Sequence, residues 1–317
     1  MGGVRLGIGN DGAVLAPSGR TEWVLSCDAF LEGVHFLADR HPPDSAGYKS
    51  LARAASDLVA MGAAPRYFLL TLALPLRRTG AWLDAFLRGM AKASRELGMR
   101  LIGGDTKRHP TVAISITVLG EVPPGLAVTR AGARPGDIIY VSGTLGAAEL
   151  GLRLIKGDRS LVAKTRSSES SSLLRAHLYP QIRVDLGSWL ARHRVATAMM
   201  DISDGLSTDL GRLCAASRVG ARIWAERVPC VRLAAALPRK LRQARLDPLE
   251  LALNGGEDYE LLFTVSPRNE KRLRRAPGFE NLTPIGRIER GRKILLVGGN
   301  GKPAPLASGG WDPFREK

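Results

Sequence analysis

Acidic side chains stand at the ends of predicted strands and in glycine-rich turns along this chain. They are Asp11, Asp28, Asp57, Asp105, Asp201, Asp204 and Glu257. Each alone has an ordinary explanation, because aspartate is a common turn former and an aspartate in mid-helix can face water. Their settings favour a function. Asp105 follows two glycines, which let a ligand approach the backbone closely, and Asp201–Gly205 (DISDG) places two carboxylates and a hydroxyl on one tight turn.

Oxygen donors without histidine or cysteine favour a hard cation, Mg²⁺ rather than zinc. The five histidines show no zinc-binding spacing such as His-Glu-x-x-His. Carboxylates gathered in one cleft repel one another unless cations bind there, and bound Mg²⁺ offers positions to phosphate oxygens. The pattern therefore predicts a site for several Mg²⁺ ions and a polyphosphate substrate.

Common nucleotide-binding motifs match this chain in their residue pattern but not in the secondary structure that they require. Gly7–Gly12 (GIGNDG) fits the dinucleotide fingerprint and, with Val14, the glycine-rich loop of protein kinases. A dinucleotide site needs a helix that opens at the glycines, whereas a strand is predicted after them. A protein kinase needs a strand lysine and the His-Arg-Asp and Asp-Phe-Gly motifs. The first lysine, Lys49, lies in a predicted helix and neither tripeptide occurs, so both classes are disfavoured.

The elements that must position these residues alternate between strand-like and helix-like patterns, which predicts a mixed α/β fold. The strands expected are Ala13–Pro17, Trp23–Ser26, Tyr67–Leu74, Val112–Leu119, Ile138–Val141, Met199–Ile202 and Tyr259–Val265. The helices expected run from an N-cap at Asp44 or Ser45 to near Gly62, over Ala81–Leu97 and over Asp209–Ser217, and a loop is expected at Arg166–Ser172.

A domain boundary is predicted at two turn clusters, Pro123–Gly125 and Gly132–Gly136. Residues 1–126 form the first expected domain and residues 127–317 form the second. A length of 317 residues suits two domains.

Composition excludes several classes of protein. Hydrophobic residues make up 44 % and charged residues 24 %, a globular balance. The longest apolar stretches are too short and too interrupted to span a membrane, and three scattered cysteines predict neither a disulfide framework nor a cysteine-rich zinc site. A cytoplasmic location is therefore expected. The net charge of +16 permits nucleic-acid binding, but 5 % aromatic residues offer few stacking platforms, so nucleic acid is a disfavoured partner.

These motifs together resemble the thiamine-monophosphate kinase family of the aminoimidazole ribonucleotide synthetase-like superfamily. The similar stretches are Gly7–Leu15, Ser26–Phe36, Ala46–Pro65, Leu101–Thr106, Gly120–Pro123, Thr129–Asp137, Asp201–Leu210, Gly255–Glu260 and Gly310-Trp311. The resemblance implies an α/β (α+β) two-domain fold, with an N-terminal sheet that forms a barrel in a homodimer and a C-terminal α/β sandwich. It also implies phosphorylation of thiamine monophosphate by ATP with Mg²⁺. On this resemblance, residues 1–126 would bind ATP and Mg²⁺ and form the dimer, and residues 127–317 would complete the nucleotide and substrate site.

The resemblance implies a role for each matching residue. Metal binding falls to Asp11, Ser26, Cys27, Asp28, Asp57, Asp105, Asp201 and Asp204. ATP contacts fall to Gly104, Asp105, Arg130 and Ser203, and contacts with thiamine phosphate fall to His35, Glu257 and Trp311. Asp28, Asp105 and Asp204 are expected to matter most for catalysis. Arg130 suits a bidentate phosphate contact, and Trp311 suits stacking on a cationic ring.

Two departures from the family pattern leave alternatives open. Asn10 stands where an aspartate is usual, and Cys27 where threonine is common. A catalytically weakened ATP-binding relative therefore remains an alternative, as does another ATP-using member of the superfamily. Ser26–Phe30 (SCDAF) differs from the Gly-Val-Gly-Thr-Lys-like segment of aminoimidazole ribonucleotide synthetase. A basic nucleic-acid-binding protein is the least favoured reading.

Overall fold

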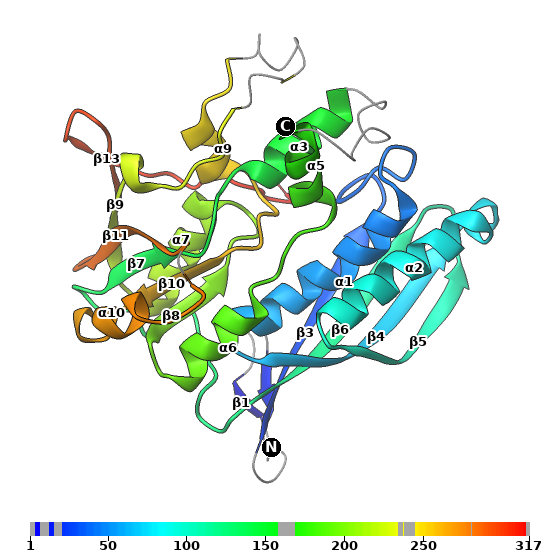
Figure 1. Ribbon diagram of the computed structural model, residues 1–317, viewed down its shortest axis with the longest axis horizontal. Coiled ribbons are helices and arrows are strands. Elements are labelled where there is room, and N and C mark those ends of the chain that lie inside the picture. Colours follow the sequence, from blue (N-terminus) through cyan, green and yellow to red (C-terminus); the bar gives the residue numbers. More distant parts are fainter. Residues whose placement is uncertain are drawn as a thin grey trace.

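Two β-sheets, each with its own helices, make up the computed structural model, which describes residues 4–6, 13–15, 21–157, 169–233, 237, 245–279 and 281–314 (Figure 1). The strand order of the first sheet is β1-β2-β3-β6-β4-β5, and that of the second is β13-β12-β9-β11-β7-β10-β8. The strands of the first sheet are β1 (Val4–Leu6), β2 (Ala13–Leu15), β3 (Glu22–Leu31), β4 (Ala64–Leu74), β5 (Arg100–Arg108) and β6 (Ala113–Val122).

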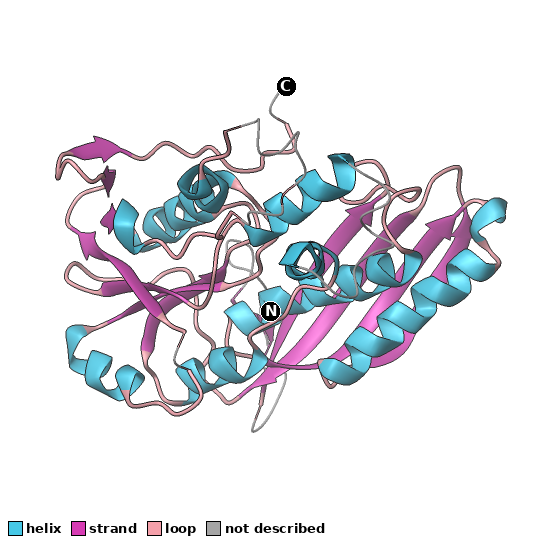
Figure 2. Cartoon of the chain, turned by 45° about the horizontal axis from the view of Figure 1, so that its top comes forward, coloured by secondary structure: helices cyan, strands magenta, loops and turns pink. Residues whose placement is uncertain are grey.

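Helices α1 (Pro43–Ala60) and α2 (Ala81–Glu96) cover one face of the first sheet, and the short η1 (Leu76–Arg78) precedes α2 (Figures 1 and 2). Burial alternates strictly along β6, as expected for a strand with one covered face. The buried side chains of β3, β4 and β6 meet those of both helices in one apolar core. The opposite face of the sheet carries no helix of the described chain, as Figure 2 shows.

The N-cap of helix α1 is Pro42, two residues before the nearer of the two expected caps. Pro43 occupies the first helical position, where its missing N–H costs nothing. Asp44 lies in the first turn, and the Ser45 hydroxyl donates to the Pro42 carbonyl at 2.7 Å, so the predicted cap was wrong. The predicted end was confirmed, because the helix closes at Met61 and Gly62 takes the left-handed conformation at φ +75°.

The second sheet is mixed, since β12 runs parallel to β9 while all other strand pairs of this sheet are antiparallel. Its strands are β7 (Ile138–Val141), β8 (Ala196–Asp201), β9 (Gly220–Trp224), β10 (Leu261–Val265), β11 (Thr283–Glu289), β12 (Ile294–Val297) and β13 (Pro303–Pro305). The helices of this half are α3 (Ala147–Gly157), α5 (Glu169–Leu178), α6 (Val184–Arg192), α7 (Leu206–Ser217), η2 (Ala225–Arg227), α9 (Pro248–Asn254) and α10 (Pro267–Arg274).

The expected strands and helices within the described residues are present, with shifted ends. Strand β3 extends well beyond the predicted Trp23–Ser26, because all ten of its residues pair with β6. The prediction of a loop at Arg166–Ser172 was wrong for residues 169–172, which belong to α5. Residues 166–168 lie outside the described chain. Among the described helices, none combines the length and the apolar character that a membrane crossing requires.

The two halves meet along α1. The first sheet ends at Val122 and the second begins at Ile138. Near the end of α1, Val59 and Ala60 pack in a core that also contains Leu190 of α6 and Phe263 of β10. Helix α1 is therefore sandwiched between the first sheet and the second unit, and the architecture is the two-part mixed α/β fold expected from the sequence.

Candidate active site

One face of α1 carries the polar residues that join the two halves of the molecule. Lys49, Arg53, Ser56 and Asp57 follow one another at intervals of four, three and one residues, which places them on the same side of a helix. Lys49 and Ser56 are buried, and the side chain of Arg53 is 15 % exposed. We call these four residues the α1 polar face.

Strand β3 supplies two partners for this face. Ser26 and Asp28 are two residues apart, so they point to the same side of the strand. The Ser26 hydroxyl donates to Asp57 Oδ2 at 2.5 Å. Arg53 Nε donates to Asp28 Oδ2 at 2.7 Å, and Nη2 lies 3.4 Å from Oδ1. The ladder between β3 and β6 and the core beneath α1 hold these groups in place.

The second sheet brings Asp201 to the same face. This residue ends β8, where it pairs with Leu261 of β10, and it is only 2 % exposed. The buried Ser56 hydroxyl donates to Asp201 Oδ2 at 2.7 Å. A buried carboxylate needs such a partner, so α1 and β8 are fixed to each other at this point.

The turn after β8 is organised around the first turns of α7. Gly205 has φ +104°, a conformation that glycine adopts easily. The backbone N–H groups of Ser203 and Asp204 donate to Asp209 Oδ2 at 3.0 and 2.9 Å. Arg212 bridges Asp204 and Asp209 at 2.5 and 2.8 Å. Burial raises the pKa of Asp209 to about 7, although the hydrogen bond from the Asp204 N–H opposes that rise.

The backbone of Arg130 lies at the other end of α7. Its carbonyl accepts a hydrogen bond of 2.9 Å from Ser217 in the last turn of α7. The charge of Arg130 nevertheless acts on Arg212, the arginine that is bonded to Asp204.

Glu257 comes from the loop that leads into β10 and has a left-handed backbone at φ +68°. Such strain persists only where the surroundings hold the chain, and here the Glu257 N–H donates to the Ser203 carbonyl at 2.8 Å. Lys49 Nζ lies 2.7 Å from Glu257 Oε2. Although burial opposes the negative charge, Lys49 lowers the pKa of Glu257 to about 2.

A buried chain of imidazoles continues from this ion pair. His177 of α5 lies 3.3 Å from Lys49 Nζ through Nδ1, and its Nε2 lies 3.0 Å from His41 Nε2. Burial and the charge on Lys49 lower the pKa of His41 to about 4. The same causes lower the pKa of His177 well below its usual range. Both rings are therefore neutral at pH 7, so one donates a hydrogen bond to the other.

His35 stands beside the α1 polar face. Its ring stacks on Phe30 with centroids 5.7 Å apart, and its Nδ1 accepts from the Leu31 N–H at 3.0 Å. That bond leaves any proton of the neutral ring on Nε2. Burial and the adjacent Arg53 lower the pKa of His35 to about 4, so His35 is neutral at pH 7.

Trp311 approaches the Asp204 turn through its backbone. Its N–H donates to the Asp204 carbonyl at 3.0 Å, and its side chain is 41 % exposed. The preceding segment is tied to α7 by a contact of 2.8 Å between Thr208 and Ser308. A Cβ at Gly310 would lie 1.9 Å from the Asp204 carbonyl oxygen, so only glycine allows this approach.

Two of the predicted residues lie elsewhere in the single chain. Gly104 and Asp105 belong to β5, and β6 and β4 separate β5 from β3. Adjacent strands lie about 4.8 Å apart, so Asp105 is at least about 14 Å from the strand that carries Asp28. Asp105 also pairs with Thr71, which faces away from the helices. Within one chain, therefore, Gly104 and Asp105 do not lie next to Asp28.

Cys27 also faces away from α1, since it alternates with Ser26 and Asp28. Its Sγ lies 3.5 Å from the hydroxyls of Ser115 and Thr117 on the open face. Its thiol therefore points away from the carboxylates, although its backbone lies between two of the predicted ligands. Asp11 and Asn10 lie outside the described residues.

The carboxylates that do come together offer only oxygen donors, which suit Mg²⁺. Four carboxylates lie on or beside the α1 polar face and the adjoining turn: Asp28, Asp57, Asp201 and Asp204. Each accepts a hydrogen bond from a serine or an arginine. Within the described chain, no three His, Cys, Asp or Glu side chains stand close enough to hold one ion by themselves. The donor chemistry fits Mg²⁺ that also takes ligands from a phosphate substrate or water, as is usual for this ion.

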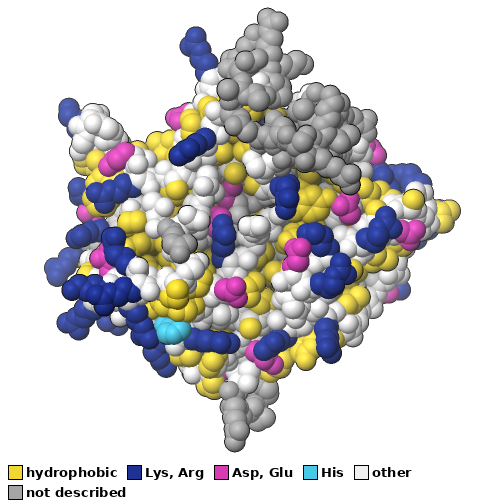
Figure 3. All heavy atoms as spheres, in the orientation of Figure 1, with side chains coloured by type: hydrophobic (Ala, Val, Ile, Leu, Met, Phe, Trp, Pro, Cys, Tyr) yellow, Lys and Arg dark blue, Asp and Glu magenta, His cyan; other side chains and the backbone are white. Residues whose placement is uncertain are grey.

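Basic side chains gather on another part of the surface. Figure 3 shows Lys and Arg residues over α10 and the neighbouring strands of the second sheet. A pocket there is lined by Trp189, His193, Arg268, Lys271, Arg272, Arg275, Ala276 and Pro277. These residues differ from those of the carboxylate site, so part of the net positive charge lies away from it.

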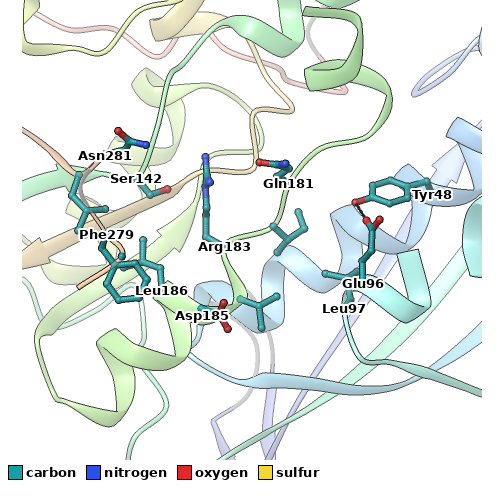
Figure 4. Close-up of a pocket in the computed structure, with 14 residues that line it drawn as sticks. Tyr48, Glu96, Leu97, Ser142, Gln181, Arg183, Asp185, Leu186, Phe279 and Asn281 are labelled. Carbon is teal, nitrogen blue, oxygen red and sulfur yellow. Dashed lines mark hydrogen bonds between the residues drawn. The ribbon is translucent and has the colours of Figure 1, made fainter. Parts of the chain in front are cut away.

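A pocket of about 460 Å³ opens between the helices of the first half and the second unit (Figure 4). Tyr48 and Glu96 stand on one side, joined by a hydrogen bond of 2.8 Å, Phe279 and Asn281 stand on the other, and Arg183 lies between them. Arg183 is held by Glu260, since its Nε donates to Oε2 at 2.7 Å. None of the predicted site residues that the structure describes lines this pocket.

Sequence reasoning missed several residues of the site. They are Lys49, Arg53, Ser56, Arg212, His177 and His41. Helical spacing from Asp57 could have indicated the first three, and spacing from Asp204 and Asp209 could have indicated Arg212. No local signal points to His177, which reaches the site from α5, far away in the sequence.

Family models cover most of the chain. Residues 9–122 match the N-terminal domain of AIR synthase related proteins, and residues 134–298 match the C-terminal domain of the same proteins. The break between the two matches falls between β6 and β7.

Similar proteins extend over nearly the full length. The thiamine-monophosphate kinase of Escherichia coli (strain K12) is 39 % identical over 313 residues, which cover 98 % of this chain and 92 % of that protein. That of Bacillus subtilis (strain 168) is 34 % identical, covering 93 % and 88 %. The solved structure of AaThiL complexed with AMPPCP and TMP superposes with a TM-score of 0.81 at 32 % identity, covering 97 % of this chain and 92 % of that one.

Proposed function

The chain belongs to the family of AIR synthase related proteins, and because its near-full-length relatives are thiamine-monophosphate kinases, we propose that it transfers the γ-phosphoryl group of ATP to thiamine monophosphate and so makes thiamine pyrophosphate. The observation that carries this proposal is the 39 % identity over 92 % of the Escherichia coli kinase. The gathering of the described carboxylates of the first and second halves around α1 is consistent with it.

Three residues would hold the acceptor. Glu257 is ionised at pH 7, which suits a cationic or amino-bearing heterocycle. The ring of Trp311 is exposed enough to stack on that heterocycle, with a cation–π contribution from the thiazolium. His35 is neutral and would donate a hydrogen bond through Nε2.

The acceptor needs no general base. The second pKa of a phosphate monoester is about 6, so its oxygen is largely deprotonated at neutral pH. The main obstacle to the transfer is electrostatic repulsion between the phosphates of ATP and the phosphate of thiamine monophosphate. Ser203, in the turn before α7, and Arg130, whose charge acts on Arg212, would bind the nucleotide phosphates. Mg²⁺ held by Asp28, Asp57, Asp201 and Asp204 would neutralise phosphate charge. The protein positions the two phosphates in line.

A homodimer would complete this site. Leu69, Leu101 and Ile102 on β4 and β5 are 39, 51 and 55 % exposed, and Trp23 stacks on Tyr67 at 5.9 Å. A second copy that packs on the open face and along the β5 edge would cover these groups. Contact along this edge would also bring Gly104 and Asp105 of β5 to the partner subunit, so that residues far apart in one chain could serve one reaction.

We also propose a cytoplasmic location. Cys27, Cys214 and Cys230 are free thiols, and Cys27 is exposed. Free exposed thiols are typical of a reducing compartment.

The first experiment is a coupled assay of the purified protein with ATP, Mg²⁺ and thiamine monophosphate. Formation of thiamine pyrophosphate that requires both Mg²⁺ and the acceptor is the expected result. ADP release without thiamine pyrophosphate would contradict the acceptor. Binding of ATP without any turnover would indicate the catalytically weakened relative.

A further inference from the structure

Arg53 has a buried hydrogen-bond donor that no group of the described residues accepts. Its Nε and Nη2 face Asp28, while Nη1 is buried and has no partner in the part of the chain that the structure describes. Buried donors almost always have a partner, because an unpaired one costs free energy. The unused Nη1 therefore raises the question of what it binds.

The guanidinium cannot turn easily to find another partner. Asp28 holds one edge of its fork, and its Cζ lies 5.6 Å from the centre of the Phe30 ring. A charge above an aromatic face and beside a carboxylate is held from two sides. The position of Nη1 is thus fixed by the fold.

An unpaired donor is not by itself a binding site, and Arg78 shows this. Arg78 also has a buried unpaired nitrogen, an ion pair of 2.7 Å with Asp39, and an aromatic neighbour, Trp82, at 5.7 Å. Its side chain is 16 % exposed, against 15 % for Arg53. Arg78 stands on η1, however, and none of the residues predicted to bind substrate is among its contacts.

The surroundings of Arg53 distinguish it. The ring of Phe30 lies beneath both Arg53 and His35, and the charge on Arg53 lowers the pKa of His35. Arg53 also lies close enough to Glu257 for its charge to lower the pKa of that carboxyl group. Glu257 and His35 are the proposed thiamine-binding residues. An anion that accompanies a thiamine group would therefore find Nη1 within the same site.

We propose that Arg53 binds the phosphate of thiamine monophosphate through Nη1, while its other edge remains on Asp28. This inference rests on the proposed function and specifies which side chain reads the phosphate of the acceptor. An arginine suits the task, since it stays charged at every pH of interest and has donors on two edges. Arg53 would then distinguish thiamine monophosphate from thiamine.

The test compares Arg53→Met, Arg53→Lys and the matched control Arg78→Met. Binding of thiamine monophosphate and of thiamine is measured by calorimetry on the full chain with Mg²⁺, and KM for each substrate and kcat are measured in the coupled assay. Thermal unfolding monitors the fold. Arg53→Lys keeps a positive charge for Asp28, which preserves a usable variant if Arg53→Met unfolds.

A lost charged hydrogen bond weakens binding about 10- to 100-fold. We expect Arg53→Met to raise KM and Kd for thiamine monophosphate by that factor, with KM for ATP and Kd for thiamine unchanged within about twofold. Arg53→Lys should show an intermediate loss, because lysine supplies charge without the fork. Arg78→Met should bind both compounds as the wild type does.

An equal loss of affinity for thiamine and thiamine monophosphate in Arg53→Met would overturn the inference, since a merely structural role predicts it. A rise in KM for ATP alone would assign Nη1 to the nucleotide and also overturn it. If Arg53→Met unfolds, an unchanged Kd for thiamine monophosphate in Arg53→Lys would overturn it. Wild-type protein that makes no thiamine pyrophosphate would instead refute the proposed function, and the inference with it.

Discussion

Individual side chains of the site combine opposite charges at close range. Lys49 meets Glu257 and Arg53 meets Asp28 along the α1 polar face. These pairs are partly or fully buried, so removing one member leaves an uncompensated charge. Substitutions that keep hydrogen bonding, or that act on exposed groups, therefore report on function more cleanly than alanine at a paired residue.

The contact between His41 and His177 predicts a fold that is sensitive to acid. The pKa of His41 is about 4 in the folded protein, against the ordinary value of 6.5 that it has in the unfolded chain. As the pH falls through this window the unfolded chain binds the proton first, so the free energy of unfolding decreases. We expect His41→Gln to lessen that decrease by up to about 1.4 kcal/mol per pH unit, the value for one proton. Urea unfolding between pH 7 and 4.5 measures it, and the exposed His109→Gln is the control. Equal slopes for wild type and His41→Gln would contradict this prediction.

Trp311 allows a test of acceptor stacking that spares the fold. The described contact of Trp311 with the Asp204 turn is made by its backbone. We expect Trp311→Ala to raise KM for thiamine monophosphate about tenfold, as for loss of one stacking contact, and to leave the melting temperature nearly unchanged. Trp311→Phe should restore most of the affinity. Phe314→Ala, at a side chain that is 92 % exposed, serves as the control; a similar KM in all three variants would exclude stacking.

Among the elements, α1 has the greatest influence on the site, and its position depends on close contact with α2. A Cβ at Gly89 would lie 1.8 Å from the Asp44 carbonyl oxygen, and one at Gly47 would lie 1.9 Å from that of Phe86. The two helices are thus packed as closely as their backbones allow. Any change that separates them would shift the α1 polar face relative to β3 and β8.

This packing predicts opposite effects for two glycine substitutions. Gly89→Ala should destabilise the protein by about 1–3 kcal/mol, because its methyl group overlaps backbone. Gly211 lies within α7, and nothing stands within 4 Å of a Cβ there. Gly211→Ala should therefore stabilise by about 0.5–1 kcal/mol through helix propensity. Chemical denaturation measures both, and a stable Gly89→Ala variant would disprove the close packing of α1 on α2.

At the scale of the whole molecule, the candidate site lies between the two sheets. The open face of the first sheet is the surface that the proposed second subunit would cover. Strand β5 stands at one edge with Asp105 on the face away from the helices. The proposed homodimer gives this strand a role. It also accounts for the exposed apolar residues of β4 and β5 without a further partner, whereas the basic surface in Figure 3 belongs to the other half.

The shared site predicts complementation between two inactive variants. Asp28→Asn and Asp105→Ala should each lose at least about 100-fold in turnover, as for lost electrostatic stabilisation. Asp105 is exposed, so its substitution should leave the melting temperature nearly unchanged. Subunits mixed after unfolding and refolding should recover about a quarter of wild-type activity, since half of the dimers then carry one intact site. Absence of recovery, with dimers shown by sedimentation, would place Asp28 and Asp105 in separate roles.

The sequence by itself determined the family, the two-part α/β fold and the kinds of residue in the site. Glycine-rich turns, oxygen-only donors and strand periodicity are local properties, so Asp28, Asp57, Asp201, Asp204 and Glu257 could be named without a structure. Helix ends such as that of α1 at Gly62 were also readable, because a left-handed glycine stops a helix locally.

The tertiary structure decided which of these residues meet. Strand order separated Asp105 from Asp28, although both lie on strands of the same sheet. Packing of α5 against α1 brought His177 to Lys49 across 128 positions of sequence, and the register of α1 on β3 placed Arg53 on Asp28. Local patterns specify the period and the face of an element, whereas the neighbours of that face depend on how distant apolar surfaces pack together.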